Sequence, residues 1–148
     1  MPVIKGAQVV EAMGGRITKQ VEELKNAGVE PCLAILRVGE DGSQMAYERG
    51  ARNRLAKYGI KCETTALDID VSQEDFEKAF RGLNEDASVH GILILQPLPK
   101  SLSIESIKNE INPLKDVDAI SPTTLYRVFA WDKQAFAPCT AEGVIEIL

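Results

Sequence analysis

Along residues 9–24, apolar side chains recur every three or four positions, which is the spacing of one face of an amphipathic helix. The members of this stripe are Val9, Val10, Met13, Ile17, Val21 and Leu24. The stripe stops at residues 26–28, where Gly28 can take the left-handed conformation that commonly ends helices. A second helix is predicted over residues 44–58, ending at Gly59.

Short apolar runs without helical spacing predict three strands. They cover residues 32–38, 60–69 and 91–95. Between the last two, Ser72 and Asp75 resemble a capping box ahead of a helix with an apolar face. Helices and strands therefore alternate along the chain, and this order predicts a three-layer α/β/α fold with a mostly parallel sheet.

Beyond Leu95 the pattern becomes irregular. Residues 96–100 contain two prolines, which predicts a stiff loop at the carboxyl end of a strand, the edge where open α/β sheets bind ligands. A short helix over 103–110, a loop over 112–118 and a region of mixed pattern follow. Thr140 is expected to cap a last helix with Gly143 in its first turn, and we expect the chain to continue beyond Leu148 in a longer protein.

Composition and charge exclude several classes of protein. The chain has 148 residues, of which 45% are hydrophobic, and this size supports a single core. It carries 17 basic and 22 acidic residues, a net charge of −5, so we expect no nucleic-acid partner. No secretory signal opens the sequence, and the longest apolar run, Ile92–Leu95, cannot span a bilayer. These features predict a soluble, cytoplasmic protein without a membrane partner.

Cysteine and histidine give little reason to expect metal chemistry. Cys32, Cys62 and Cys139 are scattered and odd in number, which favours reduced structural cysteines. His90 is the only histidine and precedes a strand-opening glycine, a position typical of a surface turn. We therefore expect neither a metal site nor a catalytic triad.

Two groups of residues could carry chemistry. Tyr47 and Ala51 lie on one face of the second predicted helix, together with Leu55 and Tyr58. Packing is the commoner role of such a stripe, and ligand contact is the alternative. Asp116 and Asp118 flank Val117, so an extended stretch would place both carboxylates on the same side. They are either solvated loop acids or ligand-binding groups at the edge where the proline loop lies.

Several motifs occur together in one order, and none is specific alone. They are Val38-Gly39 with Tyr47 nine residues after the valine, Gly59-Ile60 twelve residues after the tyrosine, the run from Gly91 to Pro97-Leu98-Pro99, Lys115-Asp116-Val117-Asp118, and Pro138-Cys139-Thr140 with Gly143. In this order and spacing they resemble the bifunctional methylenetetrahydrofolate dehydrogenase/cyclohydrolase (FolD) family. The resemblance covers nearly the whole chain.

The resemblance implies an amino-terminal folate-binding catalytic domain over residues 1–120. Residues 121–148 would connect it to a Rossmann domain that mainly binds NADP or NAD, so the cofactor-binding residues are expected beyond Leu148. The resemblance implies that the longer protein is a homodimer that acts in one-carbon metabolism and purine biosynthesis. In its reaction, hydride would pass from 5,10-methylene-tetrahydrofolate to the nicotinamide. The residues implicated in catalysis are Tyr47, Gln96 and Asp118, and those implicated in substrate binding are Tyr47, Pro97, Leu98, Pro99, Asp116 and Asp118.

The sequence departs from the family at several of its functional positions. Ala51 stands where the family has its catalytic lysine, and Leu95 where it has its glutamine. Gln96 is displaced by one position, which in a strand would turn it to the opposite face. The other departures are Ala119, Thr124 and Tyr126 in place of glycine, asparagine and glycine. Because the lysine and glutamine serve chiefly the cyclohydrolase step, we expect that activity to be weak or missing, with Arg54 able to assist only electrostatically.

Two alternatives stay open at this point. The chain could be the substrate domain of another NAD(P)-dependent dehydrogenase, of the amino-acid or shikimate type, in which a lysine and an aspartate usually carry the chemistry. It could also be a paralogue that binds folate, or a protein partner, without catalysis. Ala51 and Leu95 favour the second alternative, whereas the KDVD and PCT motifs count against the first.

Overall fold

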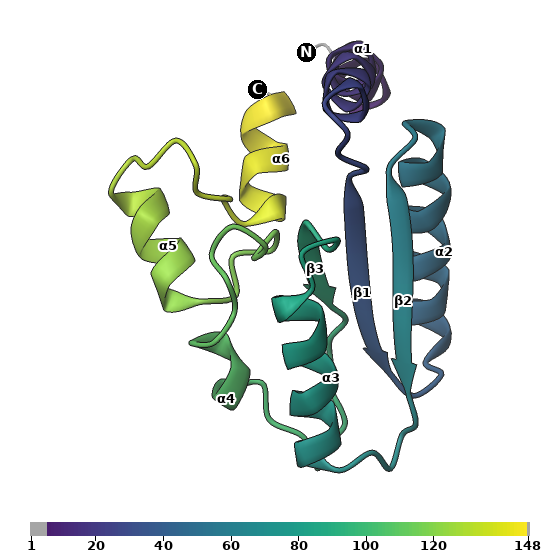
Figure 1. Ribbon diagram of the computed structural model, residues 1–148, viewed down its shortest axis with the longest axis vertical. Helices are drawn as coiled ribbons and strands as arrows, with labels where there is room; N and C mark the ends of the chain where they lie inside the picture. The colour runs from purple at the N-terminus through teal and green to yellow at the C-terminus, as the bar shows by residue number, and fades with distance from the viewer. Residues whose placement is uncertain (1–5, 148) are drawn as a thin grey trace, which may run out of the picture.

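The apolar run Cys32–Val38 forms β1, the central strand of a parallel sheet (Figure 1). In the described part of the chain the sheet has the order β2-β1-β3, with β2 at Lys61–Leu67 and β3 at Gly91–Ile94. Both neighbours pair with β1 in parallel, Leu33 lying opposite Cys62 on one side and Gly91 on the other. The predicted parallel sheet is confirmed.

The computed structural model describes residues 6–147. Residues 1–5, which open the expected folate-binding domain, and Leu148, which closes the expected connecting segment, lie outside the described residues. The expectation that the cofactor-binding residues follow Leu148 therefore stays a prediction.

Helices cover both faces of this sheet. On one face, Ala34 and Leu36 of β1 pack in a buried cluster with Phe76 and Phe80 of α3 (Gln73–Glu85). On the other face, Arg37 reaches Glu48 of α2 (Gly42–Lys57). Because side chains alternate along a strand, β1 contributes to both layers. The three-layer α/β/α prediction is confirmed.

Local sequence signals explain where these elements begin and end. The Ser72 hydroxyl accepts the backbone N–H of Asp75 at 3.1 Å, so the N-cap half of the predicted capping box is present. The Asp75 carboxylate accepts the Ser72 hydroxyl at 2.7 Å in place of the Ser72 backbone N–H. The strand expected over 60–69 is shorter, because a turn in which the Val71 N–H bonds to the Asp68 carbonyl follows Leu67.

The two terminal helices lie side by side (Figure 1). The first, α1 (Gly6–Asn26), ends where predicted, and Gly28 has a φ of +82°. The last, α6 (Cys139–Ile147), begins one residue before the expected cap at Thr140, because the Glu142 N–H already bonds to the Pro138 carbonyl. Thr140 therefore lies within the first turn, which corrects its predicted role as N-cap.

Two short helices lie between β3 and α6. The helix expected over 103–110 is limited to α4 (Glu105–Lys108), and the region of mixed pattern forms α5 (Pro122–Phe129). The signal for α5 is present in the sequence, since Ser121 caps the helix and Pro122 occupies its first turn. Among residues 6–147, no helix combines the length and apolar character needed to cross a membrane.

The histidine lies at a surface turn, as the sequence indicates, whereas the three cysteines differ in their exposure. Cys32 is buried, Cys62 is half-buried and Cys139 is exposed, and none of them forms a disulfide. His90 is exposed at the turn before β3, where its Nδ1 atom accepts the backbone N–H of Cys32 at 3.3 Å.

Candidate functional site

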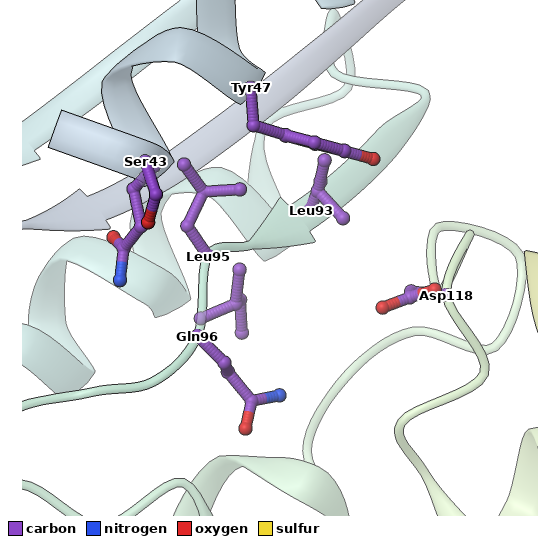
Figure 2. Close-up of a pocket in the computed structure, with 8 residues that line it drawn as sticks. Ser43, Tyr47, Leu93, Leu95, Gln96 and Asp118 are labelled. Atoms are coloured by element: carbon purple, nitrogen blue, oxygen red, sulfur yellow. The ribbon is translucent and has the colours of Figure 1, made fainter. Parts of the chain in front are cut away.

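A cavity of about 410 Å³ opens at the carboxyl edge of the sheet, where α2 begins and β3 ends (Figure 2). Its lining residues are Ser43, Gln44, Tyr47, Leu93, Ile94, Leu95, Gln96 and Asp118. They come from α2, β3, the loop after β3, and the loop before α5. The structure thus brings together three residues that sequence reasoning selected, namely Tyr47, Gln96 and Asp118.

A second cavity of about 480 Å³ adjoins the first, because the two share Tyr47, Leu93 and Asp118. Its other lining residues are Leu33, Gly50, Ala51, Arg54, Leu55, Val117 and Cys139. These walls are mostly apolar, with charge only at Arg54 and Asp118. Such a mixture of apolar surface and a few polar groups is typical of small-molecule sites.

Tyr47 stands at the junction of the two cavities. Its side chain is 60% exposed, and it reaches from α2 across Leu93 (Figure 2). Ala51 and Leu55, on the same helical face, line the second cavity. The packing interpretation of this stripe is therefore wrong for Tyr47, because no described element covers the ring. An exposed aromatic face beside two cavities can stack on a planar ligand.

The helix that carries Tyr47 is fixed to the sheet by Glu48. The Glu48 carboxylate accepts hydrogen bonds from Arg37 at 2.9 Å, Thr64 at 2.8 Å and Arg52 at 3.3 Å. Burial opposes the charge of this carboxylate, but the three donors outweigh it and lower the pKa of Glu48. The ionised Glu48 thus holds α2, and with it Tyr47, against β1 and β2.

Gln96 lines the first cavity, although a strand position would have turned it away. The strand β3 ends at Ile94, so Gln96 lies in the following loop and the alternation of a strand no longer applies. The condition under which its displacement would turn it to the opposite face, a position within a strand, is therefore not met. Figure 2 shows Gln96 and Asp118 pointing into the same space from opposite sides. Leu95, at the family's glutamine position, is buried in the cavity wall.

The proline loop does not form the wall that was expected. Within the described part of the chain, Pro97, Leu98 and Pro99 are not among the residues that line either cavity. Leu98 packs against the core cluster instead. The Pro97 carbonyl accepts a hydrogen bond from Gln44 at 3.0 Å, so this loop contacts the site through its backbone.

Asp116 and Asp118 do not lie on the same side, which corrects the extended-stretch prediction. Asp116 is fully buried, and its two oxygens accept the backbone N–H groups of Ile120 at 2.9 Å and Ser121 at 3.0 Å. It pairs with Ile92 as an isolated bridge and lines neither cavity. Its role is to close the turn before α5, and substrate binding by Asp116 is not compatible with this burial.

Asp118, in contrast, faces both cavities and lies beside Cys139. Cys139 is exposed as a residue, but partial desolvation of its sulfur atom and the neighbouring Asp118 carboxylate raise the pKa of its thiol. The protonated thiol donates to the Val117 carbonyl at 3.1 Å, which ties α6 to the Asp118 turn. Ala119, at the family's glycine position, has a φ of +53°, the left-handed region in which a glycine is unstrained.

Sequence reasoning missed several of the lining residues, among them Gln44, Leu93 and Cys139. The available signal for Gln44 was its position in the first turn of a helix that follows a strand, which places it at the ligand-binding edge. Leu93 could not be distinguished from core residues, because apolar strand residues have the same pattern whether they face a helix or a cavity.

The turn over residues 39–42 resembles a phosphate loop in sequence only. Asp41 caps α2, and its carboxylate accepts the backbone N–H groups of Ser43 and Gln44, both at 3.0 Å. Gly39, with a φ of +73°, packs so closely on Ile69 that a Cβ atom would lie 2.8 Å from its side chain. The amides at the start of α2 are therefore already paired and are not available to a nucleotide. Nor do residues 6–147 contain a group of three or more His, Cys, Asp or Glu side chains placed to hold a metal.

A parallel α/β domain with adjoining cavities at the carboxyl edge of its sheet is the architecture of a small-molecule-binding enzyme domain. The family model described as tetrahydrofolate dehydrogenase/cyclohydrolase, catalytic domain, matches residues 4–118. The chain belongs to this family.

Individual relatives agree with this assignment. The bifunctional protein FolD of Alkaliphilus oremlandii (strain OhILAs) is 47% identical over 146 residues, which are 99% of this chain and 51% of that protein. The structure of the FolD methylenetetrahydrofolate dehydrogenase/cyclohydrolase from Campylobacter jejuni has a TM-score of 0.94 at 29% identity and covers 100% of this chain and 52% of that chain. The Trypanosoma brucei FolD, complexed with NADP cofactor and inhibitor, has a TM-score of 0.90 at 29% identity, with the same coverage. The chain thus spans about half the length of these relatives.

Proposed function

We propose that this chain is the folate-binding catalytic domain of a methylenetetrahydrofolate dehydrogenase. The reaction of the complete protein would be hydride transfer from 5,10-methylene-tetrahydrofolate to NADP or NAD, the nicotinamide being the acceptor. The observation that carries the proposal is the convergence of Tyr47, Gln96 and Asp118 on the first cavity, which adjoins the second at Tyr47 and Asp118. Family membership supports a tetrahydrofolate derivative as the ligand.

The chemistry of the cavities suits the parts of a folate. The carboxylate of Asp118 can accept paired N–H donors from an aminopyrimidine edge, and the exposed ring of Tyr47 can stack on the planar ring system. The apolar walls at Leu33, Leu55 and Leu93 exclude water from the bound ring. Gln96, opposite Asp118, offers both a donor and an acceptor to the ligand. These residues bind and orient the substrate, which is the contribution that hydride transfer requires of them.

The nucleotide cofactor would be held by a second domain, whose residues follow Leu148. The turn at residues 39–42 has its amides occupied by Asp41, so it does not fit the phosphates of a dinucleotide. Relatives that are about twice as long as this chain support a second half with that task, and the Trypanosoma brucei relative is complexed with NADP. By the same resemblance, the complete protein would be a cytoplasmic homodimer that serves purine biosynthesis. Sedimentation of the complete protein would test whether it is a dimer.

The cyclohydrolase step is proposed to be weak, because Ala51 places a methyl group where the family has a lysine. Ala51 lines the second cavity, so an ammonium at this position would reach the bound substrate. Arg54 lines the same cavity one turn further along α2, but a guanidinium does not exchange protons near neutral pH. A second candidate function, folate binding without turnover, is favoured by the same substitution.

The decisive experiment compares wild type with Ala51→Lys in the protein that joins this chain to its nicotinamide-binding half. Wild type is expected to transfer hydride and to hydrolyse methenyl-tetrahydrofolate slowly. Ala51→Lys should raise hydrolysis by about 10²-fold, the lower range for a positioned proton-transfer group. Ala56→Lys makes the same change at an exposed alanine of α2 that lines neither cavity, and it is the matched control. Fast hydrolysis by wild type would contradict the weak-cyclohydrolase proposal, and folate binding without hydride transfer would establish the second candidate.

A further inference from the structure

Gln44 is a buried polar residue that lines the first cavity. The proposed function assigns no role to it. It lies in the first turn of α2, where the Asp41 carboxylate fixes its backbone N–H at 3.0 Å. Its side chain is 7% exposed although it carries a full amide. A glutamine is rarely so buried without a specific partner.

One half of this amide has such a partner. The Nε2 atom donates to the Pro97 carbonyl at 3.0 Å, which joins the beginning of α2 to the loop after β3. On the other side of Gln96, the Leu95 N–H bonds to the Leu36 carbonyl of the sheet, also at 3.0 Å. The backbone of Gln96 is therefore anchored on both sides, while its side chain stays exposed and points into the space that Asp118 faces (Figure 2).

The carbonyl half of the Gln44 amide, in contrast, makes no hydrogen bond within the described part of the chain. The Oε1 atom is buried and has no hydrogen-bond partner among the described residues. An unpaired buried acceptor costs free energy, and a methionine of similar length would avoid that cost. What a methionine would lose is the bond to the Pro97 carbonyl. The useful contribution of Gln44 is thus its donor group.

We propose that Gln44 is a positioning residue of the folate site, which acts on Gln96 through the Pro97 carbonyl. The inference rests on the proposed function, because it assumes that Gln96 contacts bound folate. Gln44 lines the first cavity, but it is buried and its amide donor is taken by the Pro97 carbonyl, so it need not touch the ligand. Holding Gln96 in place before the ligand arrives removes part of the ordering cost of binding.

The test measures tetrahydrofolate affinity of the 148-residue chain by isothermal titration calorimetry, with variants of Gln44 and Gln96. Gln44→Met, which lacks both polar atoms, should weaken binding by about 3- to 10-fold, the net value of one hydrogen bond. Gln44→Glu should weaken it further, because a carboxylate oxygen would face the Pro97 carbonyl. Gln20→Met makes the same change at an exposed position of α1 and should leave affinity unchanged.

A double-mutant cycle separates positioning from general damage to the fold. If Gln44 acts through Gln96, then Gln44→Met should change affinity by less than about 2-fold in a Gln96→Ala background. Gln44→Asn, which keeps an amide that is too short to reach Pro97, should match Gln44→Met and serves where the methionine variant is poorly folded. Urea unfolding of each variant confirms that the folded state is compared.

The outcomes distinguish the inference from the function on which it rests. Unchanged affinity in Gln44→Met and Gln44→Asn, or an equal loss in the Gln96→Ala background, overturns the positioning role while folate binding stands. If Gln44→Glu binds more tightly than Gln44→Met, the Oε1 atom of Gln44 accepts a hydrogen bond from the ligand directly. That result also overturns the positioning role. A wild-type chain that does not bind tetrahydrofolate overturns the proposed function, and this inference with it.

Discussion

The turn around Asp116 and the cavity edge at Asp118 are two positions apart in sequence, yet they belong to different parts of the molecule. Asp116 is fully buried and uses both oxygens on backbone N–H groups. Asp118 is half-buried and lines two cavities. Two aspartate carboxylates thus have opposite roles. The role of each depends on whether backbone N–H groups already bond to its oxygens. A carboxylate that is already paired supports the fold, and one that faces a cavity is available to a ligand.

The largest effect expected from this comparison is loss of stability in Asp116→Ala. Removing the carboxylate leaves the buried N–H groups of Ile120 and Ser121 unpaired, which should lower the free energy of unfolding by about 3 kcal/mol. Urea denaturation followed by circular dichroism measures it. Asp70→Ala, at an exposed aspartate, is the control and should change stability by less than about 0.5 kcal/mol. A similarly small effect at Asp116 would remove the distinction between the two carboxylates.

Asp118→Ala should show the opposite profile. Losing charge-assisted hydrogen bonds to a ligand costs about 1.5–3 kcal/mol, so tetrahydrofolate affinity should fall about 10- to 100-fold. The unfolding free energy should stay within about 0.5 kcal/mol of wild type, because the Asp118 side chain closes no backbone turn. Calorimetric titration and urea denaturation of the same preparations give both values. A variant that lost stability and kept its affinity would reverse the comparison.

Glu48 extends the comparison to a third carboxylate, because its oxygens are already paired, like those of Asp116, but it lies on α2, the helix that carries Tyr47. Its pKa is lowered from the ordinary 4.5, so the stability that it contributes is present above that pH and is lost as the pH falls through the lower, folded-state value. Glu48→Gln should cost about 1–2 kcal/mol at pH 7. The difference from wild type should shrink in urea denaturation near pH 3. A difference that is constant with pH would mean that its charge does not hold α2.

The smallest predicted effect concerns the residue directly after Asp118. Ala119 adopts a left-handed φ of +53°, which costs a non-glycine residue about 1 kcal/mol. Ala119→Gly relieves this strain but gives the unfolded chain more freedom, so a net gain of about 0.5 kcal/mol is expected. Thermal unfolding would detect it as a small rise in Tm. A fall in Tm would show that the Ala119 methyl group, which is buried, contributes more by packing than it costs in strain.

The sequence was sufficient to predict the fold, because each strand and most helices carry local signals. Apolar runs, helical stripes, the N-cap at Ser72 and the helix end at Gly28 depend only on nearby residues, and all of them recur in the structure. The predicted start of α6 at Thr140 is wrong by one residue. The helix α5 was missed, although Ser121 and Pro122 are typical of a helix N-terminus. Where these helices begin depends on hydrogen bonds made by single residues.

The site was predictable in part. Tyr47, Gln96 and Asp118 were selected through motifs and do converge. The errors at Asp116 and the proline loop share one cause, since both depend on where the backbone turns after β3 and before α5. No local pattern reports that Gln44 bonds to Pro97, 53 positions further along the chain. Long-range backbone contacts of this kind become visible only in the structure.

The location of the proposed folate site can be measured directly by titrating the isotope-labelled chain with tetrahydrofolate and following its backbone amide resonances. The account predicts that the largest shifts occur at Tyr47, Leu93 and Asp118, around the two adjoining cavities. Shifts concentrated instead between α1 and α6, where Met13, Arg16 and Glu146 line another cavity, or no shifts at all, would contradict it.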